Sequence, residues 1–150
     1  MKAGGGDEFG LPLRVYIEDT DAGGIVYYVN YLKYFERART EFMRSRGFAR
    51  AALPVAGVMF VVSALQVDYL RPARLDDELV ACARVSGGGR ARLLFAQRIL
   101  RAGEEICRAQ VSVACVNPGT GRPRALPRAM YALLNTSGPL PDSACSQGRE

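Results

Sequence analysis

The chain has 150 residues, nearly half of them apolar, and a formal net charge of +5 at pH 7. This length and balance are typical of one globular domain with its own core. No apolar run approaches the roughly 20 residues that span a bilayer, and residues 1–10 lack the apolar stretch of a secretory signal, so we expect a cytoplasmic protein. The sequence has no histidine, which excludes zinc catalysis and histidine-dependent triads.

The cysteines and the basic residues narrow the function further. Cys82, Cys107 and Cys115 lie in apolar, strand-like segments and Cys145 in a polar tail, without metal-ligand spacing. We therefore expect buried, reduced thiols and no metal site. Eighteen of the 20 basic residues are arginine, whose planar fork suits phosphate. The arginines form no concentrated run and no nucleic-acid motif, so a nucleic-acid partner is not expected.

A strand and a long helix are predicted in the first third of the chain. Residues 12–18 ("PLRVYIE") are short and rich in strand-forming residues. Residues 30–46 change to helical periodicity, with an apolar stripe formed by Tyr31, Phe35, Ala38 and Phe42. Gly47 is suited to end this helix in a left-handed conformation.

From residue 58 onward the apolar residues alternate, which predicts strands. Four are expected, at residues 58–70, 78–85, 92–100 and 105–116. In the first of them one face is formed by Val61, Leu65, Val67 and Tyr69. Glycine-containing breaks at 86–89 and 102–104 favour hairpins, and residues 126–134 are compatible with a short closing helix.

Antiparallel hairpins that follow a single helix predict an α+β fold, with the sheet wrapped around the helix. The expected domain covers residues 11–134. Residues 1–10 and 135–150 lack periodicity and are predicted to be flexible tails.

Residues 18–42 join acids, glycines and aromatic residues where the first strand meets the helix, in the stretch "EDTDAGGIVYYVNYLKYFERARTEF". This stretch resembles the signature of the hotdog-fold thioesterases, in particular the YbgC-type acyl-CoA thioesterases and 4-hydroxybenzoyl-CoA thioesterase. The resemblance continues in "RPARLDDELV", "FAQRIL" and "RPRALP" and covers nearly all of residues 13–134. It implies a hotdog fold, an antiparallel sheet around one long central helix, and thioester hydrolysis without a cofactor.

Asp21 matches the catalytic acid of this family. Thioester hydrolysis needs an attacking oxygen, and a carboxylate serves either as nucleophile or as general base toward water. An Asx-turn or helix cap is the alternative role for such an Asp. Gly23 and Gly24 allow close approach of the backbone to a substrate, and the following helix directs free N–H groups at the turn. The resemblance implies that the backbone N–H of Tyr28 polarises the thioester carbonyl.

The roles of neighbouring side chains are more open. YbgC-type chains commonly carry His at the position of Tyr28, whereas the hydroxybenzoyl enzyme carries Tyr. Asp19 is expected to hydrogen-bond the turn. Asn30 either fixes the first helical turn or lines the substrate pocket. Glu36 and Glu41 either reach a neighbouring site or lie solvated on the outer side of the helix, as charges there usually do.

The resemblance also implies a coenzyme site. Arg90 and Arg92 follow three glycines, where the family presents residues to the nucleotide phosphates, although Ser is common near position 92 in YbgC-type chains. Four other arginines compete for this role: Arg71, Arg74, Arg122 and Arg124.

We interpret the chain as an acyl-CoA thioesterase. The resemblance implies that two sheets pair edge to edge in a homodimer or homotetramer, with active sites at the subunit interface. Its substrate is an acyl-CoA or an acyl carrier protein thioester. A hydroxyacyl-thioester dehydratase is disfavoured because those hotdog enzymes use a catalytic His. The alternative from another class is a non-catalytic acyl-CoA-binding or envelope-associated scaffold protein, which would bind thioesters without turnover.

Overall fold

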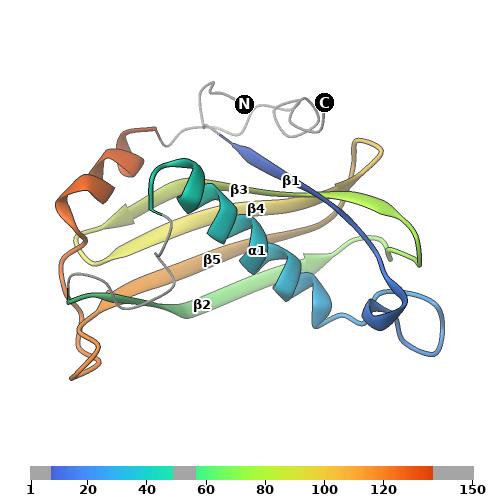
Figure 1. Ribbon diagram of the computed structural model, residues 1–150, viewed down its shortest axis with the longest axis horizontal. Helices are drawn as coiled ribbons and strands as arrows, with labels where there is room; N and C mark the ends of the chain where they lie inside the picture. The colour runs from blue at the N-terminus through green and yellow to red at the C-terminus, as the bar shows by residue number, and fades with distance from the viewer. Residues whose placement is uncertain (1–7, 49–56, 137–150) are drawn as a thin grey trace.

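The computed structural model describes residues 8–48 and 57–136, and in them one long helix lies against one face of an antiparallel sheet (Figure 1). The five strands follow the spatial order β1-β3-β4-β5-β2. Their bounds are β1 (Phe9–Arg14), β2 (Met59–Tyr69), β3 (Glu78–Gly89), β4 (Arg92–Arg101) and β5 (Glu104–Val116). This arrangement confirms the predicted α+β class. The first strand begins at Phe9, two residues before the expected domain boundary.

Helix α1 (Asn30–Ser45) buries an aromatic face against the sheet. Its buried residues are Tyr31, Tyr34, Phe35, Ala38, Phe42 and Met43. The helix packs on β3, β1 and β4. It ends as predicted, because Gly47 adopts a φ of +93° and the N–H of Phe48 then donates to the carbonyl of Met43 at 2.9 Å. Local helix propensity is not sufficient to stabilise a helix of this length, so most of its stability comes from burial of the apolar stripe.

The first strand differs from its prediction. It ends at Arg14, and residues Ile17–Asp19 form a 3-10 turn, η1, in place of a strand. The Asp19 carboxylate accepts a hydrogen bond from the N–H of Tyr16 at 2.9 Å, and this local bond competes with strand pairing. The predicted closing helix is also of another type. Residues Arg128–Thr136 form the 3-10 helix η2, in which the N–H of Met130 donates to the carbonyl of Pro127.

Strand β2 contains an irregularity that changes which of its residues share a face. Its register against β5 shifts between Val62 and Ala64. Val61 therefore pairs with Ala114, on the face opposite the core, and not on the face predicted for it. The residues that pair with the core side of β5 are Phe60, Val62, Leu65, Val67 and Tyr69. The bulge moves one residue of the predicted stripe to the other side of the sheet.

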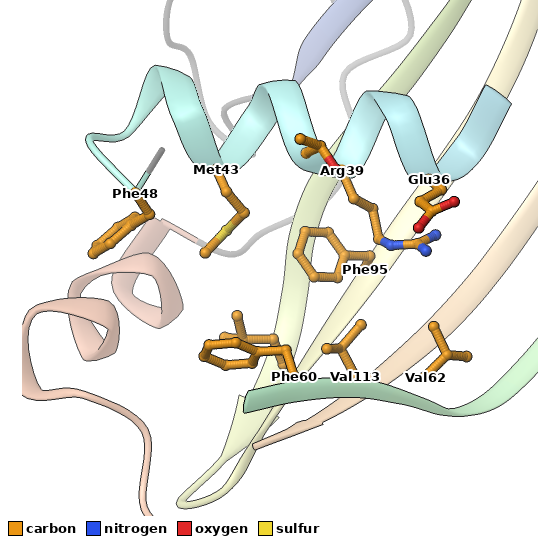
Figure 2. A pocket seen from close by; sticks show the side chains of 10 residues that line it. Glu36, Arg39, Met43, Phe48, Phe60, Val62, Phe95 and Val113 are labelled. Carbon is orange, nitrogen blue, oxygen red and sulfur yellow. The ribbon is translucent and has the colours of Figure 1, made fainter. Parts of the chain in front are cut away.

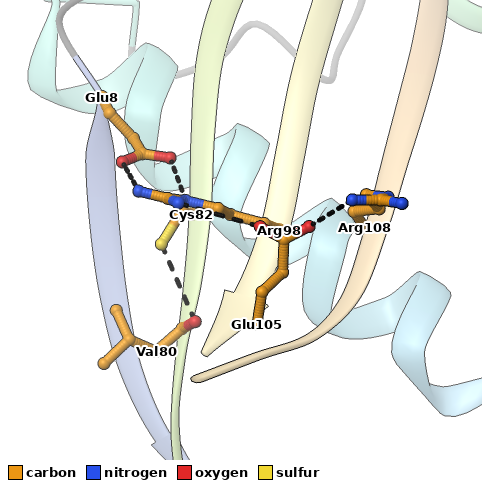
Figure 3. A network of polar contacts seen from close by, with 6 residues as sticks. All are labelled: Glu8, Val80, Cys82, Arg98, Glu105 and Arg108. Atoms are coloured by element: carbon orange, nitrogen blue, oxygen red, sulfur yellow. Dashed lines mark hydrogen bonds and ion pairs between the residues drawn. The ribbon is translucent and has the colours of Figure 1, made fainter. Parts of the chain in front are cut away.

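A network of charged side chains crosses the face of the sheet opposite α1 (Figure 3). Arg98 of β4 donates two hydrogen bonds of 3.1 Å to Glu8 and lies 3.8 Å from Glu105. Arg108 of β5 continues the network to Glu105 and to Asp68 of β2. Burial raises the pKa of Glu8, although Arg98 opposes this effect. These contacts link β4 and β5 to the segment before β1 and to β2.

Two cysteines agree with the prediction and one does not. Cys107 and Cys115 are free and buried, and burial raises the pKa of the Cys107 thiol to about 12. Cys82 is disulfide-bonded, contrary to the expectation of reduced thiols. The predictions made for Cys145 and for the outer parts of both tails fall outside the described residues. None of the described helices is long and apolar enough to cross a membrane.

Candidate active site

A tight turn of residues 19–27 presents Asp21 at its tip. The N–H of Asp21 donates to the carbonyl of Ile25 at 2.9 Å, and the N–H of Gly24 donates back to the carbonyl of Asp21 at 3.0 Å. At the base of the turn the N–H of Tyr27 donates to the carbonyl of Asp19 at 3.0 Å. These bonds reverse the direction of the chain, so that α1 begins directly beside the turn.

The Asp21 carboxylate is exposed, and one of its oxygens is fixed. Oδ1 accepts the N–H of Gly23 at 2.8 Å in an Asx-turn. Oδ2 has no hydrogen-bond partner among the described residues and faces solvent. Gly24 adopts a φ of +80°, which an L-residue reaches only with strain. The turn therefore orients the carboxylate and leaves one oxygen available to a ligand.

The backbone at the start of α1 supplies unpaired donors next to this turn. Within the described part of the chain, the N–H of Tyr28 donates to no protein acceptor. It lies two residues before Asn30, the first residue of the helix, where N–H groups point away from the helix body. The Tyr28 side chain is 59% exposed. Such a donor is suited to an oxygen that becomes negatively charged in a reaction.

Three tyrosine rings, one just before α1, one in α1 and one in β2, form a wall beside the turn. Tyr28 and Tyr69 meet edge to face at 6.2 Å, and Tyr69 meets Tyr31 at 5.4 Å. The Tyr69 hydroxyl donates to the carbonyl of Tyr28 at 3.1 Å. Sequence reasoning placed Tyr69 only on a strand face and missed this role. Burial raises the pKa of the Tyr69 and Tyr31 hydroxyls.

Asn30 and Asp19 hold the turn in place. The Asn30 side-chain amide donates to the carbonyl of Asp19 at 2.8 Å and so joins the start of α1 to the base of the turn. The carboxylate of Asp19 accepts from the N–H of Tyr16 and caps η1, which leads into the turn. The hydroxyl of Tyr34 is buried with no hydrogen-bond partner among the described residues. Burial, followed by the nearby charge of Asp19, raises the pKa of Tyr34.

The turn docks on the segment before β3. The N–H of Val26 donates to the carbonyl of Ala73 at 2.8 Å, and the N–H of Ala73 donates to the Tyr31 hydroxyl at 2.9 Å. Asp77 braces this segment, since its carboxylate accepts 2.8 Å bonds from the N–H of Arg74 and from Arg101. Burial alone would raise the pKa of Asp77, but these bonds and charges outweigh it and lower that pKa. The two acids in "RLDD" were the sequence feature from which these hydrogen bonds of Asp77 could have been predicted.

The predicted coenzyme arginines do not lie near Asp21 in the same chain. Arg90 and Arg92 are at the β3–β4 hairpin, whereas the Asp21 turn docks beside the opposite end of β3 (Figure 1). The twelve residues of β3 separate these ends by roughly 35–40 Å. The structure therefore brings together Asp21, Gly24, Tyr28 and Asn30, but not the two arginines. Of the competing arginines, Arg74 pairs through its backbone with Ile25 of the turn, in an isolated antiparallel β-bridge.

A groove runs along α1 between the helix and strands β2 and β5, and the sequence did not reveal it. One hollow of about 310 Å³ borders the first half of the helix, with Val29, Leu32, Leu65 and Val111 in its lining. A second hollow of about 120 Å³ continues toward Met43 and Phe48, with Phe60, Phe95 and Val113 on the sheet side (Figure 2). Within the described residues no cluster of three His, Cys, Asp or Glu side chains is suited to a metal ion.

Comparison with known proteins identifies the family. The model of the thioesterase superfamily matches residues 23–108. The chain belongs to the thioesterase superfamily. It is therefore a thioester hydrolase, and the predicted family and hotdog fold are confirmed.

Relatives match over most of their length. The chain is 45% identical over 125 residues to the acyl-CoA thioester hydrolase YbgC of Escherichia coli O157:H7, which covers 83% of this chain and 93% of that protein. It is also 45% identical over 128 residues to the acyl-CoA thioesterase YbgC of Haemophilus influenzae, covering 85% and 94%. Among solved structures, a probable thioesterase from Bartonella henselae is 38% identical with a TM-score of 0.74, covering 80% of this chain and 99% of that one.

Proposed function

We propose that this thioester hydrolase converts acyl-CoA to a free acid and CoA, with Asp21 as the reacting carboxylate. The observation that carries the proposal is the position of Asp21, whose free Oδ2 lies on a turn that leads directly to the unpaired N–H of Tyr28. A carboxylate and a preorganised donor on one rigid turn supply both parts that thioester cleavage requires. The printed activities of the Escherichia and Haemophilus relatives support the choice of acyl-CoA.

Two routes use the same residues. In the first, an Asp21 oxygen attacks the thioester carbon, the carbon–sulfur bond breaks, CoA leaves as the thiolate, and water then hydrolyses the resulting anhydride. In the second, Asp21 accepts a proton from water, the hydroxide attacks, and the thiolate leaving group takes up the proton. In both routes the N–H of Tyr28 donates to the carbonyl oxygen as it gains negative charge. A burst of CoA release before steady state indicates the anhydride route.

A second copy of the chain completes the site in this proposal. Strand β2 is an edge strand, and its exposed apolar residues include Val61, Val62, Leu65 and Tyr69. Among the described residues no strand pairs with the outer edge of this eleven-residue strand, so it is suited to pair with another strand. Antiparallel pairing of two β2 strands places the β3–β4 hairpin end of one copy beside the Asp21 end of the other. Arg90 and Arg92 of the second copy are then in position to contact the coenzyme phosphates.

The decisive experiment compares Asp21→Asn with Asp19→Asn. Asn keeps the Asx-turn, so Asp21→Asn should retain the fold and the oligomer but lose at least a hundredfold in kcat, in keeping with the typical contribution of an acid–base residue. Asp19→Asn should lose far less, because Asn can still accept the Tyr16 bond. The measurements are kcat across acyl-CoA and acyl carrier protein thioesters, thermal stability, and mass in solution.

The outcomes separate the alternatives. Full activity in folded Asp21→Asn would overturn the catalytic assignment. Tight acyl-CoA binding with no turnover of any thioester by the unmodified protein would favour the scaffold role over hydrolysis. Mass in solution distinguishes the proposed dimer from the tetramer that was the other expectation. A cytoplasmic location stays a prediction.

A further inference from the structure

Tyr34 carries a hydroxyl that its surroundings in the core do not satisfy. The residue is 1% exposed and lies on the buried face of α1, where its ring meets that of Tyr31 edge to face at 6.2 Å. The hydroxyl oxygen has no hydrogen-bond partner in the part of the chain that the structure describes. A buried hydroxyl without a partner destabilises the folded state, whereas a phenyl ring of the same shape does not. A tyrosine at this position therefore needs a reason that packing alone does not supply.

The carboxylate of Asp19 is the charged acceptor beside this hydroxyl. Asn30 and Tyr34 are one turn apart on the same side of α1, and the Asn30 amide donates to the carbonyl of Asp19 at 2.8 Å. Side chains on a helix lean toward its N-terminus, so the Tyr34 ring extends over the turn that contains Asn30. Burial raises the pKa of Tyr34 most, and the charge of Asp19 raises it further, more than any other charge does. Asp19 thus acts on Tyr34 at close range, although the hydroxyl lies outside hydrogen-bond geometry.

Asp19 is the residue through which α1 and the turn are joined. Its carbonyl accepts the N–H of Tyr27 at 3.0 Å as well as the amide of Asn30. Its Oδ2 accepts the N–H of Tyr16 at 2.9 Å, while Oδ1 accepts no hydrogen bond from a described residue. A donor from Tyr34 would occupy this second oxygen. Asp19 would then be fixed against both of the first two turns of the helix.

The position of Asp19 affects both groups that the proposed reaction uses. Asp21 follows it by two residues in the turn, and Tyr28 follows Tyr27, whose N–H is held by the Asp19 carbonyl. A shift of Asp19 along α1 would therefore move the Asp21 carboxylate and the Tyr28 N–H relative to the helix. Displacements of less than 1 Å lower the rate of a reaction that depends on alignment.

We infer that Tyr34 is a positioning residue for thioester hydrolysis, whose hydroxyl donates to the carboxylate of Asp19 and thereby holds the Asp21 turn against α1. Tyr34 touches none of the reacting atoms and acts through Asp19. The bond satisfies the buried hydroxyl and the second carboxylate oxygen together. This inference rests on the roles of Asp21 and Tyr28 in the proposed function.

Tyr34→Phe tests the bond through the sign of a stability change. Phe keeps the ring and its contact with Tyr31, and removes only the hydroxyl. If the hydroxyl donates to Asp19, its loss should lower Tm by several degrees. A hydroxyl without a partner gives the opposite result, because its removal leaves Tm unchanged or raises it. Tyr27→Phe removes the hydroxyl of a ring that is 48% exposed, and as the matched control it should leave Tm unchanged.

A double-mutant cycle with Asp19→Ala tests whether the hydroxyl acts through that carboxylate. Tyr34→Phe alone should lower kcat about three- to tenfold and leave KM unchanged, because it disturbs alignment without touching the substrate. On the Asp19→Ala background the same substitution should change neither kcat nor Tm, since the acceptor is already absent. A role in packing alone would give equal losses on both backgrounds. If Asp19→Ala does not fold, Asp19→Asn takes its place, and its neutral amide should reduce the effect of Tyr34→Phe.

Three results would overturn the inference. The first is a Tyr34→Phe protein at least as stable as the unmodified one, the second is an unchanged kcat, and the third is an equal loss of kcat with and without the Asp19 carboxylate. Each leaves the proposed function standing while the unmodified protein hydrolyses acyl-CoA and Asp21→Asn does not. An unmodified protein that turns over no thioester would instead refute the proposed function, and the positioning role would fall with it whatever the Tm of Tyr34→Phe.

Discussion

Alanine at Gly23 or Gly24 should separate the shape of the turn of residues 19–27 from the position of the Asp21 carboxylate. Gly24 has a φ of +80° and open space where a Cβ would lie. Gly24→Ala therefore meets only backbone strain, about 1–2 kcal/mol. For a domain of this size this lowers Tm by about 2–8 °C. Gly23 lies outside the left-handed region, but its new Cβ would be 3.3 Å from Oδ1 of Asp21.

Gly23→Ala should therefore act on the reaction and hardly on stability. The Asp21 carboxylate must move by a few tenths of an ångström to admit the methyl group. Since a 1 Å misplacement costs about a hundredfold in rate, this shift should lower kcat about three- to tenfold. Steady-state release of CoA thiol and thermal unfolding measure the two effects. An unchanged kcat in Gly23→Ala, or a Tm loss equal to that of Gly24→Ala, would refute the reasoning.

Three other predictions follow from the site. Tyr69→Phe removes the hydroxyl that holds the carbonyl at the start of α1, so kcat should fall severalfold with a Tm change of only a few degrees; an unchanged kcat would contradict this role. The pKa of Asp77 is lowered on folding, so its contribution to stability is present above about pH 4 and is lost as pH falls through the folded pKa. Asp77→Asn should therefore lower Tm at pH 6 and reduce the further loss between about pH 4 and pH 2, and parallel Tm curves would count against it. Replacing Arg90 and Arg92 by Ala should raise KM for acyl-CoA more than it lowers kcat, and should leave thioesters without the nucleotide unaffected; equal losses with both substrates would instead indicate a role in the fold.

The sequence was most informative where a repeated pattern matched one element. The apolar stripe of α1 and its final Gly47 predicted the helix to within one residue at its C-terminal end. Alternating residues with glycine breaks predicted β3, β4 and β5, because each forms hairpins with its neighbour in the chain. The motif of residues 18–42 predicted a turn at Asp21 with Asn30 close to it, and the structure shows that turn and the bond from Asn30 to Asp19.

The errors have a common cause, which is dependence on distant parts of the chain. A bulge against β5 determines which face of the sheet Val61 lies on, and the sequence of β2 does not show where the register shifts. The coenzyme role expected for Arg90 is not among these errors and stays a prediction, although β3 holds Arg90 and Asp21 at opposite ends of one chain. The groove beside α1 exists because the helix covers β3 and not β2, a relation that local periodicity does not contain.

The order of the strands in the sheet also governs how the chain folds. The first two strands, β1 and β2, occupy the two edges, and each pairs only with a strand made later. During synthesis α1 emerges before β3 and β4, the strands on which its aromatic face packs. The meander of β3, β4 and β5 is local and can form early, whereas the edges require closure of long loops. A nascent chain that ends after β2 thus exposes its helix and strand edges, and such a chain is prone to aggregate until the second half of the protein is made.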